Sequence, residues 1–172
     1  IWIVINKKKN SVQVMGDGDG VSKNKFEKAI LTIGLSQKEK DKLGRFGLGA
    51  ISELGKCEYF TFTSTTKSNN NAYIEWYFNT KEISEKKELG GIPYKERKDL
   101  IYSKKKSGNA TSGKRFVNWR TCVNIVNIST DRHIGRLDPN KLKNDILEIY
   151  GPTILRLNTL IHIKFIDKKG SE

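Results

Sequence analysis

The chain has 172 residues and carries 32 basic against 19 acidic side chains, a formal net charge of +13 at pH 7. This length suits one compact domain that buries a real core. There is no apolar run near eighteen residues and no basic leader followed by an apolar segment, so we expect neither a membrane-spanning helix nor secretion. Cys57 and Cys122 lie in apolar stretches, and we expect buried thiols in a reducing compartment, not a disulfide or a zinc site.

The first half of the chain alternates strand patterns with glycine-rich segments. Ile1–Ile5 and Val12–Met15 are rich in β-formers and flank a polar turn, which predicts a β-hairpin. The segment Gly16–Gly20 (GDGDG) cannot continue a strand and predicts a tight turn. Apolar residues spaced by three and four over Phe26–Ile33 predict a helix of about ten residues. Leu43–Ser52 then carries three glycines ahead of a second short helix.

The second half predicts four more strands, one helix and one long excursion. The excursion, about residues 81–117, is rich in lysine, glutamate and serine, so we expect a flexible insertion. Pro139 stands where helices begin, ahead of an amphipathic pattern that runs from Leu142 to Ile149. The predicted strands are Tyr59–Thr65, Tyr73–Phe78, Cys122–Ile128 and Ile161–Ile166.

This order of elements limits the fold class. Because several predicted strands follow one another through hairpins, we expect a mixed, mostly antiparallel sheet with helices on one face. The sequence therefore predicts an α+β fold, a two-layer α/β sandwich, in a single domain over residues 1–172. A doubly wound parallel sheet does not fit, because strands and helices do not alternate regularly.

The second glycine segment has the composition of an anion site. Gly44, Gly47 and Gly49 precede a predicted helix, whose first backbone amides and dipole favour a phosphate. A Walker-type loop would need a lysine and a serine or threonine after the last glycine, whereas Ala50 and Ile51 follow here. From the glycine pattern alone, a flexible turn before a helix is an equal alternative.

Considered together, the two glycine segments resemble the GHKL ATPases, the superfamily of gyrase B, the ninety-kilodalton heat-shock chaperones, sensor histidine kinases and MutL. The run Gly44–Gly49 (GRFGLG) is similar to the second glycine motif of the chaperone-like and MORC-like branches, which makes a histidine-kinase domain the weaker match. Thr32–Lys38 looks like the lid stretch of MORC-type proteins, and Arg120–Val123 looks like the Gly-Thr-x-Val strand of the family. The resemblance implies a Bergerat-type ATP-binding fold.

The resemblance also implies an ATP and Mg²⁺ site between the sheet and the helices, with residues 34–42 as a lid. Gly18 and Gly20 would lie under the adenine and sugar, and Thr121 would hydrogen-bond near the adenine. Lys38 and Arg45 are each undecided between a phosphate contact and a solvated surface charge. The implied nucleotide-binding residues are Asp17, Gly18, Gly20, Lys38, Gly44, Arg45, Phe46, Gly47, Leu48, Gly49 and Thr121.

Two departures from the family pattern affect the expected chemistry. The first motif is normally Asp-Asn-Gly-x-Gly, and Gly16 stands where its adenine-binding aspartate belongs. Asp17 or Asp19 could replace it, or base selectivity is weaker; we favour Asp17. The general base and the magnesium-binding asparagine of the family, spaced Glu-x-x-x-Asn, are expected on a helix before Ile1, so the chain itself receives no catalytic or metal-binding assignment. Glu75–Asn79 has this spacing but is expected at the sheet surface.

The leading hypothesis is an ATP-binding and ATP-hydrolysing module of a larger GHKL protein, in which lid closure drives a conformational or dimerisation cycle. The alternative is a degenerate domain that acts as a scaffold or nucleic-acid-binding module. Lysine gathers at Lys7–Lys9, Lys104–Lys106 and Lys168–Lys169, which makes nucleic acid a candidate partner, although an AT-rich genome also enriches lysine. We expect no membrane partner and a cytoplasmic location, or a nuclear one for a eukaryotic MORC-like protein.

Overall fold

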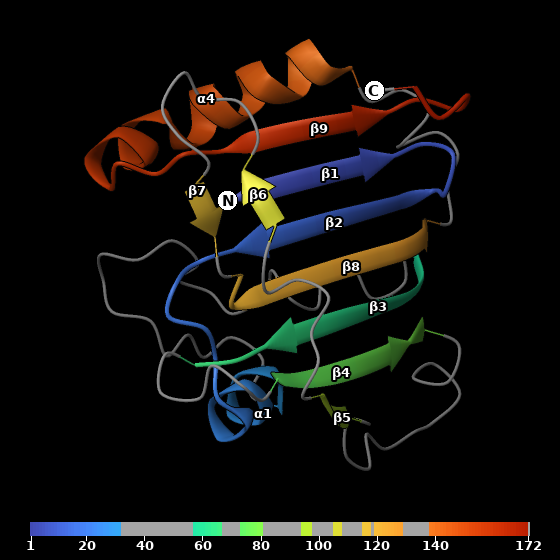
Figure 1. Ribbon diagram of the computed structural model, residues 1–172, viewed down its shortest axis with the longest axis vertical. Coiled ribbons are helices and arrows are strands. Elements are labelled where there is room, and N and C mark those ends of the chain that lie inside the picture. The colour runs from blue at the N-terminus through green and yellow to red at the C-terminus, as the bar shows by residue number, and fades with distance from the viewer. Residues whose placement is uncertain are drawn as a thin grey trace.

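The structure is a computed structural model that describes residues 1–31, 57–66, 73–80, 94–97, 105–107, 115–117, 119–128 and 138–171 (Figure 1). Its two described helices are α1 (Lys23–Leu31) and α4 (Pro139–Arg156). The described strands are β1 (Trp2–Asn6), β2 (Ser11–Gly16), β3 (Cys57–Ser64), β4 (Tyr73–Asn79), β5 (Tyr94–Arg97), β6 (Lys105–Ser107), β7 (Arg115–Val117), β8 (Thr121–Ile128) and β9 (His162–Ile166).

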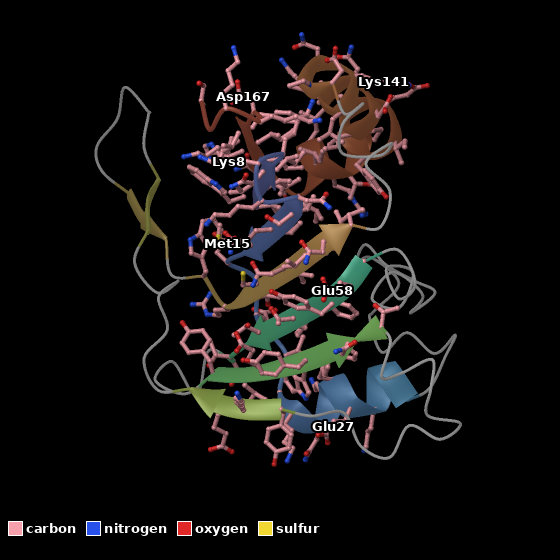
Figure 2. The ribbon with its side chains drawn as sticks, turned by 90° about the vertical axis from the view of Figure 1, so that its right-hand side faces the viewer. Lys8, Met15, Glu27, Glu58, Lys141 and Asp167 are labelled. Atoms are coloured by element: carbon pink, nitrogen blue, oxygen red, sulfur yellow. The ribbon has the colours of Figure 1, made fainter. Side chains whose placement is uncertain are left out.

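Seven of these strands form one sheet in the order β5-β4-β3-β8-β2-β1-β9, and β6 and β7 form a separate hairpin. Every neighbouring pair in the large sheet is antiparallel except β1 and β9, which run parallel. Both described helices lie on one side of this sheet, and the β6–β7 hairpin lies on the other (Figure 2). The prediction of a mixed, mostly antiparallel sheet with helices on one face is confirmed.

The predicted hairpins, the predicted helix around Phe26 and the predicted helix after Pro139 are present within the described residues. The short helix predicted after the second glycine segment lies outside them. In the first hairpin, the pairing of β1 with β2 extends from Trp2 opposite Met15 to Asn6 opposite Ser11. The range predicted as a flexible insertion, 81–117, contains β5, β6 and β7, which the sequence did not predict. These strands are four, three and three residues long, too short to show an alternating pattern. The flexibility of the insertion stays a prediction.

An aromatic core lies between the sheet and α1. Phe26 of α1 stacks on Phe62 of β3 with ring centroids 4.4 Å apart, and its ring centroid lies 4.0 Å from that of Trp76 of β4. Phe60 and Phe78 stack beside them at 4.2 Å. Trp76 is fully buried. Aromatic pairs at these distances add to the free energy of simple burial, so this cluster fixes α1 against the outer half of the sheet.

The opposite face of the sheet carries a second cluster. Three residues are buried together there: Met15 of β2, Cys122 of β8, and Trp119, which precedes β8. Trp2 and Val4 of β1 pack against them. Cys57 and Cys122 are both buried free thiols, as the sequence predicted. Because both faces of the sheet bury side chains, the middle strands are covered on two sides.

Helix α4 begins as its sequence predicts and packs less closely than α1. Asp138 caps it, since its carboxylate accepts the backbone N–H groups of Asn140 at 2.7 Å and Lys141 at 3.1 Å, and Pro139 occupies the first turn. No residue of α4 is buried. Among the described residues, six of the nine exposed large apolar side chains lie in or just after it: Leu147, Ile149, Tyr150, Leu155, Leu157 and Leu160. Neither described helix has the length and apolar character to cross a membrane.

Candidate functional site

Three strands meet at one end of the sheet beside the first glycine segment. In the sheet register, Thr121, the first residue of β8, lies between Gly16 at the end of β2 and Ser64 at the end of β3. These three positions share a face with Phe62, which packs on α1, because side chains alternate along a strand. The fold therefore places Gly16–Gly20 and Thr121 side by side, on the helix side of the sheet.

Arg120 holds the glycine segment in place. Its backbone N–H donates to the Gly16 carbonyl at 2.9 Å, and its guanidinium Nη1 donates to the carbonyls of Asp17 at 2.7 Å and Gly18 at 3.2 Å. The backbone N–H of Thr65 donates in turn to the Arg120 carbonyl at 2.9 Å. Charged donors make stronger hydrogen bonds than neutral ones, so one side chain fixes two successive carbonyls. Arg120 is a positioning residue for this turn.

The three glycines of the segment serve different purposes. Gly20 has φ +73°, and a Cβ built on it would lie 1.6 Å from the Thr65 carbonyl oxygen, so no other residue fits there without moving the backbone. A Cβ built on Gly16 or Gly18 meets no atom of the described chain within 4 Å. Gly20 is thus required by the protein itself, whereas no described atom would obstruct a Cβ at Gly16 or Gly18.

Ser64 links this segment to Thr121 and to α1. Its hydroxyl is buried, accepts the backbone N–H of Val21 at 2.9 Å and donates to the Arg120 carbonyl at 3.0 Å. The Thr121 hydroxyl lies 3.3 Å from the Ser64 oxygen. A hydroxyl has one proton, so when Ser64 gives its proton to the carbonyl, Thr121 is the donor of this pair. The Thr121 oxygen then keeps its lone pairs for a donor on a ligand or a water.

Tyr73 braces the chain just before Arg120. Its hydroxyl is buried and donates to the Trp119 carbonyl at 3.1 Å. Burial raises the pKa of the Tyr73 hydroxyl above its usual value of 10, and the nearby Arg120 charge partly opposes this shift. The neutral, hydrogen-bonding form of Tyr73 is therefore the one that the fold stabilises.

The structure describes the positions of part of the predicted residue set. It brings Asp17, Gly18, Gly20 and Thr121 to one end of the sheet. The remaining predicted residues lie outside the described residues: Lys38, Gly44, Arg45, Phe46, Gly47, Leu48 and Gly49. The sequence did not single out Ser64, and it placed Arg120 only in a strand motif. Their positions follow from strand pairing across more than fifty residues, and the one local signal is that Arg120 directly precedes Thr121.

The prediction that Glu75 lies at the sheet surface is wrong. Glu75 is 5% exposed, and its carboxylate accepts hydrogen bonds from the Thr63 hydroxyl at 3.1 Å and from the Tyr77 hydroxyl. The cause is β5, which pairs outside β4 with Lys95 opposite Glu75, so β4 is not an edge strand. Glu75 lies opposite Thr63, the neighbour of Ser64 in β3, and therefore faces away from the glycine segment. It does not belong to this site.

A mixed sheet with helices on one side, a glycine turn at a strand end and an adjacent threonine define a GHKL-type ATPase domain. Residues 1–111 match the family described as the histidine kinase-, DNA gyrase B- and HSP90-like ATPases, and the chain belongs to that family. No curated protein matches the chain. Membership implies that the domain binds and hydrolyses ATP, and family members generally use Mg²⁺ with it. Within the described residues, no group of three His, Cys, Asp or Glu side chains is placed to hold a metal ion.

Proposed function

We propose that this domain binds Mg-ATP at the end of β2, β8 and β3 and that nucleotide binding closes residues 34–42 as a lid. The observation that carries the proposal is the register that sets Gly16 beside Thr121 in a member of an ATPase family. No described atom lies within 4 Å of a Cβ built on Gly16 or Gly18, and the Thr121 hydroxyl keeps acceptor capacity; both support binding of the flat, amino-bearing edge of adenine. Lid closure then drives a conformational or dimerisation cycle, in a chaperone-like or MORC-like protein.

In this proposal each part of the chain has a separate task. Thr121 accepts a hydrogen bond from the adenine amino group, directly or through a water. The Asp17 carboxylate takes over the role of the family's adenine-binding aspartate, whose position is occupied here by Gly16. The amides of Gly44–Gly49 bind the phosphates, assisted by Lys38 or Arg45. Bound ATP supplies the phosphoryl group that is transferred to water. This hydrolysis needs a carboxylate base that orients the attacking water.

A second candidate is a domain of the same fold that binds nucleotide weakly and acts as a scaffold. The observation that favours it is Gly16, which leaves the usual adenine carboxylate missing at the end of β2. The two candidates differ in nucleotide affinity and in phosphate release by the complete protein. Measurable Mg-ATP binding without phosphate release supports the scaffold, and turnover supports the ATPase.

Calorimetric titration of the purified chain with Mg-ATP tests the binding site. We expect Gly47→Val to abolish binding by blocking the approach of phosphates to the amides, and Thr121→Val to weaken it about fivefold to tenfold, the worth of one hydrogen bond. Asp17→Asn and Asp19→Asn form a matched pair, since both remove one charge from the same turn; only Asp17→Asn should reduce affinity. Unchanged affinity in Gly47→Val, or no Mg-ATP binding by the complete protein, would overturn the proposal.

A further inference from the structure

Two lysine-rich turns that are distant in the sequence lie side by side at the end of the sheet away from the glycine segment. The first, Lys7–Asn10, joins β1 to β2, and the second, Asp167–Gly170, follows β9. Strands β1 and β9 run parallel, with Asn6 opposite Ile166, so the turns that follow them leave the sheet at the same end. Figure 2, which views this end and labels Lys8 and Asp167, shows the two turns next to each other. We call the pair the lysine turns.

Direct contacts hold the lysine turns together. The backbone N–H of Lys7 donates to the Ile166 carbonyl at 2.9 Å. The Lys8 ammonium nitrogen comes within 3.5 Å of the position that a Cβ on Gly170 would occupy, so the Lys8 side chain extends over the second turn. The Asp167 carboxylate accepts the Ser171 backbone N–H at 2.8 Å. The two turns therefore form one surface with a defined shape.

This surface is strongly and unevenly charged. The turns contain five lysines, Lys7, Lys8, Lys9, Lys168 and Lys169, and a single carboxylate, that of Asp167. Four of these lysines are exposed, whereas Lys7 is half-buried with its ammonium nitrogen 5.0 Å from the centre of the Phe165 ring. At the same end of the sheet, β3, which is separated from β2 by β8, adds Glu58, whose carboxylate accepts a hydrogen bond from the Asn127 side chain. Crowded like charges oppose folding, and a bound polyanion would relieve that cost.

We propose that the lysine turns bind the phosphate backbone of double-stranded nucleic acid, without reading its sequence. Lysines are flexible point charges suited to phosphates, whereas base recognition favours planar bidentate side chains. The two turns contain no exposed large apolar residue, so neither base stacking nor insertion into a lipid bilayer has an anchor there. The inference does not depend on ATP binding, because the glycine segment lies at the opposite end of β2, about 20 Å away along a strand of six residues.

The test is fluorescence anisotropy of the purified chain with a labelled 25-base-pair DNA duplex at several salt concentrations. Four exposed lysines on phosphates predict a slope of log affinity against log salt concentration of about −3.6. The variant Lys8→Gln/Lys168→Gln/Lys169→Gln should reduce the slope by about 2.7 units and lower affinity at least tenfold at low salt. The matched control Lys25→Gln/Lys141→Gln/Lys143→Gln removes the same charge from exposed positions on α1 and α4, and should change affinity less than threefold.

Each result decides the proposal. A selective loss in the lysine-turn variant supports it, provided that circular dichroism shows the variant to be folded. Equal losses in both triple variants would mean that net charge alone attracts DNA, which overturns the assignment to this surface. Absence of DNA binding by the unmodified chain overturns it as well. The proposal is also overturned if the lysine-turn variant retains DNA binding but loses association with phosphatidylserine vesicles. The lysine turns would then bind a membrane surface.

Discussion

At one end of β2 the chain turns through Gly16–Gly20, and at the other it turns through Lys7–Asn10. At the glycine end, the carbonyls of Gly16–Gly18 accept hydrogen bonds from Arg120, and the Ser64 hydroxyl donates to the Arg120 carbonyl. The lysine end faces outward, with four of its five lysines exposed on turns that backbone hydrogen bonds hold. A ligand at the first end must fit a shape, whereas a ligand at the second needs only charge.

This difference predicts how each end responds to substitution. Shape depends on individual atoms, so one added carbon at the crowded Gly20 position has a large effect. Charge adds up over several groups and is screened by salt, so one lysine has a small effect. Substitutions at the two ends should therefore differ in magnitude and in their salt dependence.

The largest expected effect is that of Gly20→Ala. The new Cβ would meet the Thr65 carbonyl oxygen at 1.6 Å, and alanine would have to adopt φ +73°. The strained φ alone costs about 1–3 kcal/mol, and displacement of Thr65 adds to it. Urea unfolding measures the loss of stability, and Mg-ATP titration measures any loss of affinity.

Gly18→Ala is the matched control in the same turn. Its added Cβ meets no described atom within 4 Å, so its stability should change by less than about 1 kcal/mol. Equal destabilisation by the two alanine substitutions would contradict the view that only Gly20 is required by the protein itself.

An intermediate effect is expected at Tyr73, which braces Trp119 on the approach to the glycine end. Tyr73→Phe removes the hydrogen bond to the Trp119 carbonyl and should lower the free energy of unfolding by about 1 kcal/mol at neutral pH. Because burial raises the pKa of Tyr73 in the folded state, the unfolded chain ionises first, near pH 10. The stability that Tyr73 contributes is therefore complete below pH 10 and lost as the pH rises above it.

Unfolding of the unmodified chain and of Tyr73→Phe should be compared between pH 8 and pH 11. The gap in stability between them should narrow above pH 10. Lysines also lose charge in this range, but they do so in both proteins, and the difference isolates the tyrosine. A gap that stays constant across the range would show that the hydroxyl is not protected by burial.

The sequence predicted the parts of this molecule whose signals are local. Alternating β-formers gave the first hairpin, the apolar spacing around Phe26 gave α1, and Pro139 marked the start of α4. The resemblance carried by the two glycine segments implied that Gly18, Gly20 and Thr121 share a nucleotide site, which stays a prediction; the register of β2 with β8 sets Gly16 opposite Thr121. These features depend on residues that are close in the sequence or on short sequence motifs.

The features that the sequence missed depend on pairing between distant segments. Ser64 and Arg120 became parts of the site only through the register of β3 with β8. Glu75 was taken as exposed because nothing in the short, charged segment Tyr94–Arg97 indicates a strand that would cover it. The lysine turns are separated by more than 150 residues and meet through the parallel pair of β1 and β9. Such a contact leaves no periodicity in either segment.

The smallest change in the free energy of unfolding is expected at the lysine end. It is an increase, whereas the substitutions at the glycine end lower this free energy. The variant Lys8→Gln/Lys168→Gln/Lys169→Gln removes like charges from adjacent turns, so it should raise the free energy of unfolding by about 0.5 kcal/mol at 10 mM salt. At 1 M salt the Debye length falls from about 30 Å to about 3 Å, and the gain should vanish. Urea unfolding at the two salt concentrations measures both values. A loss of stability that salt does not alter would mean that these lysines hold the turns together, and the contrast between a shaped end and a charged end would fail.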